Sequence, residues 1–218
     1  MPRTRLKVCC IASVEEARLA IRLGADALGL VSAMPSGPGV IAEELIAEVA
    51  AAVPPPVATF LLTSLQDANA IIAQQRRCRT NTLQLCDALP DGAHARLRAA
   101  LPGVALVQVI HVEGEDSVDE ALAVAPHVDT LLLDSGRPGA ATKMLGGTGQ
   151  THDWTHSRTI RDRAPVPVFL AGGLRAENIG AAVRQVAPFG VDLCTGVRTD
   201  GRLDEAKLRA FVAALHAA

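Results

Sequence analysis

The sequence predicts a single domain, residues 1–218, with an α/β fold in which eight parallel strands form one closed (β/α)8 TIM barrel. Apolar runs of strand length alternate eight times with amphipathic runs of helix length, as in βα units of a parallel sheet. The length of 218 residues fits one barrel, and a hydrophobic content of 49% supplies its core. Small-residue turns that suit a phosphate come late in the chain, where such barrels place them.

The eight βα units follow one another without a linker. The apolar runs predict strands at 6–11, 27–31, 57–62, 82–85, 105–110, 130–133, 166–170 and 191–194. The amphipathic runs predict helices near 14–23, 41–52, 65–77, 91–100, 117–125, 155–163, 176–186 and 204–216. The rival fold, an open doubly wound sheet, needs a glycine-rich turn after its first strand, and this chain has Cys9-Cys10-Ile11-Ala12-Ser13 there.

Local chemistry marks the ends of two helices. Ser13 and Glu16 form a capping-box pattern at the start of the first helix, and Gly24 is expected to end it. Asp204 is expected to begin the last helix, which carries a single apolar stripe. That stripe consists of Leu208, Phe211, Val212 and Leu215.

Composition argues against several functional classes. A formal net charge of −2 gives no polyanion-binding surface, and one Trp, no Tyr and four Phe argue against base stacking on nucleic acid. No apolar run is long enough for a membrane span or the core of a signal peptide. Five Cys without a CxxC pair indicate reduced thiols. We therefore expect a cytoplasmic monomer or homodimer that binds neither nucleic acid nor membrane.

Reactive side chains at the predicted strand ends are candidates for chemistry, because barrels carry their sites there. Asp134 directly follows the buried run 131–133, a position that favours catalysis over bracing a loop. Spacing alone favours a hydrophobic role for Cys9, since buried Cys usually acts as a small hydrophobe. Strand alternation sends Cys9 and Cys10 to opposite sides, so that one alone should face the barrel centre.

Three small-residue turns are candidates for a phosphate site. Each closes an apolar run and opens a helix-like segment, so their backbone N–H groups would point at one spot. The turns consist of Gly146, Gly147, Thr148 and Gly149, of Gly172 and Gly173, and of Thr195 and Gly196.

Taken together, these residues make the chain resemble the phosphoribosylanthranilate isomerases, (β/α)8-barrel enzymes of tryptophan biosynthesis. The resemblance covers nearly the whole chain and is most specific from Asp134 through the three turns. It also includes Lys7-Val8-Cys9, Gly24-Ala25-Asp26-Ala27-Leu28-Gly29, Leu83-Gln84-Leu85, Asp153-Trp154, Glu177-Asn178 and Val191-Asp192.

This resemblance implies roles. The family's general base falls on Cys9, its general acid on Asp134 and its phosphate site on the three turns. The implied reaction is an Amadori rearrangement of a phosphorylated aminosugar, with no cofactor and no metal. Lys7 shares a strand face with Cys9, so its ammonium could favour the thiolate if it faces inward. The i, i+4 pair His152 and His156 is expected to face solvent or cap a helix rather than bind metal.

Four segments depart from the family pattern. The family's Arg in the second βα loop, which pairs with the anthranilate carboxylate, is missing because residues 32–39 contain no cation. The family's Gln-Leu-His-Gly becomes Gln84-Leu85-Cys86-Asp87, its Cys-Gly becomes Cys9-Cys10, and a Glu after the last turn becomes Arg198. Lys7, Gln84 and Arg137 are the remaining candidates to anchor the substrate, although Arg137 also fits an ordinary solvated loop charge.

Three functions stay open at this point. The first is phosphoribosylanthranilate isomerase itself, and the second is a related barrel isomerase for another phosphorylated sugar or aminosugar. The third is a non-catalytic protein that binds a phosphate ligand. Cys9 and Asp134 argue against the third, and the missing Arg after Pro35 favours the second over the first.

Overall fold

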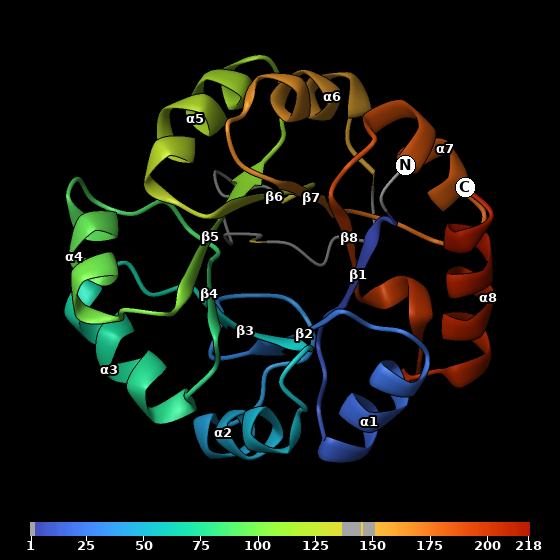
Figure 1. Cartoon of the computed structure of the whole chain (residues 1–218), viewed down its shortest axis with the longest axis horizontal. Helices are drawn as coiled ribbons and strands as arrows, with labels where there is room; N and C mark the ends of the chain where they lie inside the picture. Colours follow the sequence, from blue (N-terminus) through green and yellow to red (C-terminus); the bar gives the residue numbers. More distant parts are fainter. Residues whose placement is uncertain (1–2, 137–144, 146–150) are drawn as a thin grey trace.

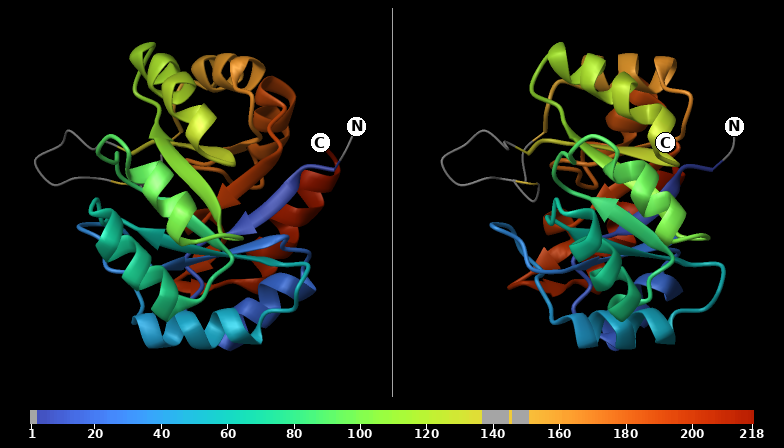
Figure 2. Two further views of the ribbon diagram at one scale, coloured as in Figure 1. Left: turned by 60° about the vertical axis from the view of Figure 1, so that its left-hand side comes forward. Right: turned by 90° about the vertical axis from the view of Figure 1, so that its left-hand side faces the viewer.

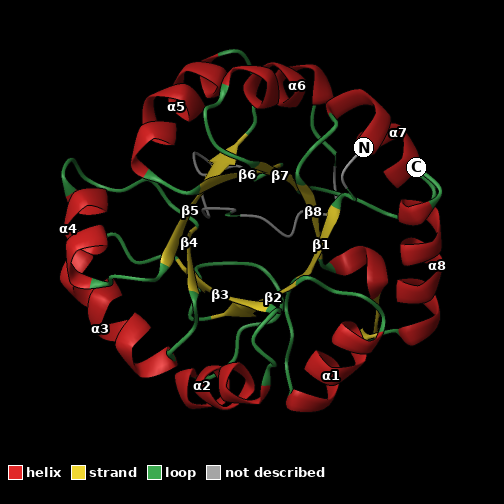
Figure 3. Cartoon of the chain, in the orientation of Figure 1, coloured by secondary structure: helices red, strands yellow, loops and turns green. Residues whose placement is uncertain are grey.

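The strands of the chain close into one parallel barrel. In this computed structural model, which describes residues 3–136, 145 and 151–218, β1 to β8 follow one another around the ring (Figure 1). Parallel pairing of β1 with β8 closes it. The strands run away from the end of the molecule that holds both termini (Figure 2). The helices form an outer layer around the yellow strands (Figure 3), which confirms the predicted fold.

The elements have the following bounds. The barrel strands are β1 (Arg5–Val8), β2 (Ala27–Val31), β3 (Ala58–Thr63), β4 (Thr82–Leu85), β5 (Ala105–His111), β6 (Thr130–Asp134), β7 (Val168–Leu170) and β8 (Gly190–Leu193). The helices are α1 (Val14–Arg22), α2 (Glu43–Ala52), α3 (Ala68–Cys78), α4 (Ala93–Ala100), α5 (Asp116–Val124), α6 (Trp154–Arg163), α7 (Ile179–Val186) and α8 (Glu205–His216). The 3-10 turns η1 (Ala125–His127) and η2 (Thr195–Val197) and the hairpin strands β9 (Arg198–Thr199) and β10 (Arg202–Leu203) complete the set.

The predicted helix ends are confirmed by their hydrogen bonds. Ser13 Oγ accepts from the Glu16 N–H at 3.2 Å to cap α1, and Gly24 follows that helix with φ 96°. Asp204 caps α8 by accepting from the Lys207 N–H at 3.1 Å. The apolar stripe of α8 faces the core.

Two differences from the prediction bear on the site. β1 ends at Val8 instead of continuing to residue 11, because Cys10 has the left-handed φ of 62°, which no strand residue adopts. The antiparallel β9–β10 hairpin was not predicted. Its strands have two residues each, too few to show a periodic pattern.

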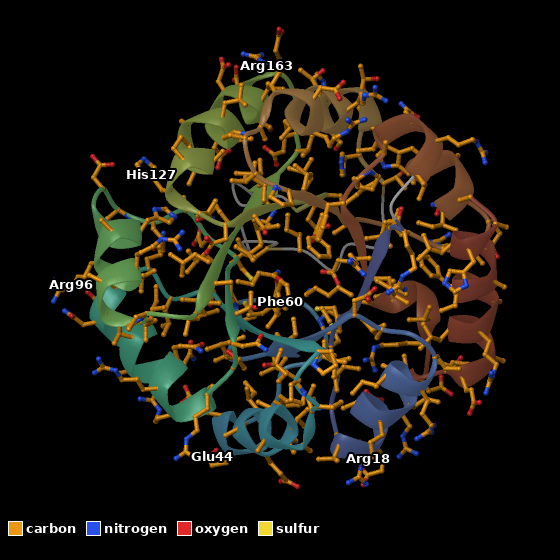
Figure 4. The ribbon with its side chains drawn as sticks, in the orientation of Figure 1. Arg18, Glu44, Phe60, Arg96, His127 and Arg163 are labelled. Carbon is orange, nitrogen blue, oxygen red and sulfur yellow. The ribbon has the colours of Figure 1, made fainter. Side chains whose placement is uncertain are left out.

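The strands separate an outer core from an inner core. Side chains on one face pack against the helices, and those on the other fill the barrel, as strand alternation requires. Phe60 lies in the middle of the ring, whereas the labelled residues Arg18, Glu44, Arg96, His127 and Arg163 lie on its periphery (Figure 4). Within the barrel, the Phe60 and Phe169 rings meet edge to face with centroids 6.2 Å apart.

Gly190 leaves the room that the Phe169 ring occupies. A Cβ at position 190 would lie 2.4 Å from Phe169 Cε1, so Gly190→Ala forces the ring out of its place. We expect the free energy of unfolding, measured with urea, to fall by about 1–3 kcal/mol. Gly114→Ala is the matched control, because a Cβ there meets nothing within 4 Å. Equal stability of the two variants would show that the barrel interior is not tightly packed.

Candidate active site at the carboxyl ends of the strands

A pocket opens where the barrel strands end. Most of the predicted site residues within the described part of the chain line it: Cys9, Gln84, Asp134, Gly172, Gly173, Thr195 and Gly196. They come from or directly after β1, β4, β6, β7 and β8, so the barrel brings together residues that are far apart in sequence. The first predicted phosphate turn (Gly146, Gly147, Thr148 and Gly149) and Arg137 lie outside the described residues.

Lys7 faces into the barrel and forms an ion pair with Asp192. Its side chain is 0% exposed, and Nζ lies 2.6 Å from Asp192 Oδ2 and 5.2 Å from the centre of the Phe60 ring. Burial disfavours the ammonium, but the Asp192 carboxylate more than offsets it, and the pKa of Lys7 lies above its ordinary value. Burial also pushes the pKa of Asp192 upward, a push that the Lys7 ammonium opposes. The 2.6 Å contact between Nζ and Oδ2 is typical of an ionised pair.

The Cys9 thiol lies beside this ammonium. A Cβ at Gly29 would be 2.7 Å from Cys9 Sγ and 3.1 Å from Lys7 Nζ, so both atoms flank the same point in the barrel. The absence of a side chain at Gly29 therefore makes room for both. A neighbouring cation favours the thiolate form of a cysteine, which is the form that can accept a proton.

The expectation that either Cys9 or Cys10, and not both, faces the barrel centre is wrong, since both line the pocket. The physical reason is the early end of β1: strand alternation stops at Val8, and the left-handed Cys10 turns its side chain back toward the pocket. Its thiol donates to the Pro38 carbonyl at 3.5 Å, which ties it to the second βα loop.

The other thiols around the pocket differ in how firmly they hold a proton. Burial raises the pKa of Cys86 to about 12. Hydrogen bonding to the neighbouring Cys194 and Cys9 thiols, together with burial, raises the pKa of Cys10. The same contact with Cys10 lowers the pKa of Cys194. Cys194 is therefore the rival of Cys9 as a thiolate in this pocket, a rivalry that sequence alone does not reveal.

Asp134 ends β6 at the pocket wall, half-buried. Its Oδ1 accepts from the Ser135 N–H at 2.7 Å, which sets the plane of the carboxyl group. Gly172 approaches it closely: a Cβ there would lie 3.2 Å from Asp134 Oδ1 and 2.9 Å from Ser135 Oγ. Any side chain at position 172, where φ is 87°, would therefore displace the carboxyl group as well as strain the turn.

The two described glycine turns lie against each other. A Cβ at Gly196 would be 2.4 Å from the Leu174 carbonyl oxygen, so the turn after β8 touches the turn after β7. Asn178 shapes the latter, because its side chain donates to the Gly173 carbonyl at 2.9 Å and accepts from the Arg175 N–H at 2.8 Å. Backbone groups of both turns thus lie next to each other in the pocket wall.

Asp192 is a pocket residue that was not among the predicted site residues. A carboxylate inside the apolar strand 190–193 was the signal available, since an ionised group is rarely buried without a partner. Within the described residues, Asp192 Oδ1 and Gln84 Oε1 are buried without a hydrogen-bond partner. Because both residues line the pocket, these oxygens can accept hydrogen bonds from a ligand's hydroxyl groups.

In the described part of the chain, no group of three or more His, Cys, Asp or Glu residues could hold a metal ion. His152, predicted to face solvent or cap a helix, is half-buried, with Nε2 2.6 Å from Ser157 Oγ. No helix among the described residues has the length and hydropathy needed to span a membrane.

Comparison with known proteins gives one consistent family. The family model of N-(5'phosphoribosyl)anthranilate (PRA) isomerase matches residues 6–214. The N-(5'-phosphoribosyl)anthranilate isomerase of Haloferax volcanii is 37% identical over 215 residues, which are 97% of this chain and 92% of that protein.

Solved structures agree with this match. Phosphoribosyl anthranilate isomerase from Thermotoga maritima superposes with a TM-score of 0.84 at 26% identity, over 99% of this chain and 100% of that one. A phosphoribosyl anthranilate isomerase in complex with reduced 1-(o-carboxyphenylamino)-1-deoxyribulose 5-phosphate shares the fold, with a TM-score of 0.81 at 24% identity over 99% and 100% of the two chains.

The buried Lys7–Asp192 ion pair is expected to contribute to the stability of the fold. Asp192→Asn leaves the Lys7 ammonium buried without a counter-charge, so we expect the free energy of unfolding at pH 7 to fall by about 3–5 kcal/mol. The double variant Lys7→Met/Asp192→Asn removes the uncompensated charge and should recover part of that loss. Urea unfolding measures both. An Asp192→Asn protein as stable as the wild type would mean that the pair is not ionised.

Proposed function

Because the chain belongs to the N-(5'-phosphoribosyl)anthranilate isomerase family, we propose that Cys9 and Asp134 are the base and the acid of its reaction. The protein is an isomerase of the aldose–ketose type in tryptophan biosynthesis. It converts N-(5'-phosphoribosyl)anthranilate into 1-(o-carboxyphenylamino)-1-deoxyribulose 5-phosphate. We place this activity in the cytoplasm, and its five free cysteines fit a reducing compartment.

Asp134 starts the reaction in this proposal. Its carboxylic acid protonates the ring oxygen of the ribosylamine, the ring C–O bond breaks, and the nitrogen lone pair forms a Schiff base with C1′. The position of Asp134 at the end of β6, in the pocket wall, suits this step. The Ser135 N–H holds the group in one orientation.

Cys9 completes the rearrangement. Its thiolate removes the proton from C2′, the C–H electron pair forms the C1′–C2′ double bond of an enolamine, and the iminium nitrogen accepts the displaced electrons. The enolamine then tautomerises to the 2-ketone, so the substrate is isomerised without gain or loss of atoms. The ammonium of Lys7 flanks the same point beside Gly29 as the Cys9 sulfur.

The phosphate is proposed to bind at the glycine turns, one of which lies beside Asp134. Gly172, Gly173, Thr195 and Gly196 offer backbone N–H groups and one hydroxyl, and the turn 146–149 is assigned to the same site from its sequence. The observation that carries the whole proposal is that Cys9, Asp134 and the two described glycine turns, 172–173 and 195–196, line one pocket.

The proposed roles predict a specific pattern of losses. Cys9→Ala and Asp134→Asn should each lower kcat by about a hundredfold or more, since each removes a proton-transfer group. The dissociation constant for a reduced product analogue should stay within about tenfold of wild type, because the glycine turns are untouched. Steady-state kinetics and calorimetry measure the two quantities.

Cys194→Ser is the matched control for thiol removal, and it should retain most of the turnover. If Cys194→Ser abolishes turnover while Cys9→Ala does not, the rival thiol is the base and the assignment of Cys9 is wrong.

The second βα loop supports a second candidate for the substrate. Met34, Ser36, Gly37 and Pro38 line the pocket, and residues 32–39 contain no cation to pair with the anthranilate carboxylate. We propose that the pocket also accepts a phosphorylated aminosugar whose aglycone carries no carboxylate. An Arg–carboxylate hydrogen bond contributes roughly 1.5–3 kcal/mol, so its loss lowers the preference for anthranilate by about tenfold to a hundredfold.

Complementation tests activity on the anthranilate substrate. Expression in a tryptophan auxotroph that lacks this isomerase should restore growth if anthranilate is the physiological aglycone, with the Cys9→Ala variant as the negative control. Introduction of Arg at position 36 (Ser36→Arg) should then lower KM for the anthranilate substrate. An unchanged KM would show that the carboxylate does not lie near this loop.

A further inference from the structure

Two positions at which the sequence departs from the family pattern, Cys10 and Arg198, contact each other. Arg198 begins β9, directly after the turn that follows β8, and its side chain is 6% exposed. Its Nη2 donates to the Cys10 carbonyl at 2.5 Å and to the Cys9 carbonyl at 3.1 Å. One guanidinium therefore binds both carbonyl groups of the turn that carries the proposed base.

The backbone of this turn needs an external constraint. Cys10 has φ 62°, a left-handed conformation that glycine adopts freely and residues with a Cβ disfavour. The Cys10 side chain also packs against Gly39, where a Cβ would lie 2.4 Å from Cys10 Cβ. Contacts on both sides thus hold a conformation that the residue type by itself does not favour.

Glu16 supplies the counter-charge and fixes the guanidinium in place. The Glu16 carboxylate accepts from Arg198 at 3.3 Å and from the N–H groups of Ala12 and Leu203 at 3.0 and 2.9 Å. Burial by itself opposes ionisation of Glu16, but these backbone donors and Arg198 bring its pKa below the ordinary value. Arg198 Nη1 also donates to the Gly201 carbonyl at 3.0 Å. The Arg198–Glu16 pair therefore links α1, the end of β1 and the β9–β10 hairpin.

We propose that Arg198 is a positioning residue, which holds the Cys9–Cys10 turn in its left-handed conformation and so keeps the Cys9 thiol aimed into the pocket. A glycine at position 10 would adopt the left-handed conformation without help, whereas Cys10 is held in it by the hydrogen bonds from Arg198. The inference rests on the proposed role of Cys9 as the base.

The geometry argues against a role for Arg198 as a ligand of the substrate phosphate. Both terminal nitrogens of the guanidinium are engaged by carbonyl groups and by the Glu16 carboxylate. A bidentate contact with a phosphate needs at least one of those terminal nitrogens, and the remaining nitrogen, Nε, is buried. The Arg198 guanidinium thus donates its hydrogen bonds to backbone carbonyl groups and to Glu16.

A double-mutant cycle with Cys10→Gly tests the proposal. Arg198→Met in the wild-type background should lower kcat on the order of tenfold to a hundredfold with KM within about twofold, because a misplaced base slows proton transfer without changing phosphate binding. In the Cys10→Gly background the same change should lower kcat by less than about threefold, because glycine keeps the left-handed turn unaided. Arg198→Lys, with one compact donor, should fall between wild type and Arg198→Met.

Each outcome decides the matter. Arg202→Met removes an exposed arginine from the same hairpin and is the matched control for loss of charge. Circular dichroism and thermal unfolding confirm that each variant is folded before its kinetics are compared. Equal losses of kcat in the two Cys10 backgrounds overturn the proposal, and so does a raised KM with unchanged kcat, which would assign Arg198 to the phosphate site. Cys9→Ala is measured in parallel: full turnover in that variant refutes the base assignment itself, whereas an inactive Cys9→Ala with an additive cycle refutes only the role of Arg198.

Discussion

The site depends on one charge pair buried at the seam where the barrel closes. Lys7 and Asp192 are register partners in the parallel pairing of β1 with β8, and their 2.6 Å contact lies inside the barrel, with Phe60 on one side. A buried ammonium is tolerated only beside a counter-charge. The register of β1 and β8 therefore determines whether Lys7 can be buried next to the pocket. Cys9 lies two residues beyond Lys7, beside the same cation. The pairing of β1 with β8, which closes the ring, therefore also places a buried ammonium beside the Cys9 thiol.

Above this seam, the site is built from backbone that leaves regular structure. β1 ends at Val8, and the left-handed Cys10 brings two adjacent thiols to one pocket, which a continuing strand would not allow. The turns after β7 and β8 approach so closely that Gly196 has no space for a side chain. Such conformations need support from the surroundings. Here the support comes from Arg198 and Glu16 at the first turn and from Asn178 at the turn after β7.

The wall of the pocket combines two kinds of surface. The glycine turns after β7 and β8 offer backbone groups without a charged side chain, in a chain whose net charge is −2. Residues 32–39 of the second βα loop contain no cation, and the Cys10 thiol donates to the Pro38 carbonyl of this loop. Members of one enzyme family can therefore share the phosphate site and the proton-transfer residues and still differ in their contacts to the aglycone. The reason is that barrel loops vary independently of the strands that carry them.

The sequence alone predicts the barrel, the order of its elements, the strand-end position of Asp134 and the candidacy of Cys9, because periodic burial and capping are local patterns that each segment carries within itself. The family resemblance added their chemical roles. Only the tertiary structure decided the early end of β1, the β9–β10 hairpin, the pairing of Lys7 with Asp192 and the grip of Arg198 on the Cys9 and Cys10 carbonyls. The contacts of Lys7 with Asp192 and of Arg198 with Cys9 and Cys10 join residues more than 180 positions apart, and a left-handed turn at a non-glycine residue leaves no local signal. Their partners are chosen by closure of the ring, which no single segment of the chain encodes.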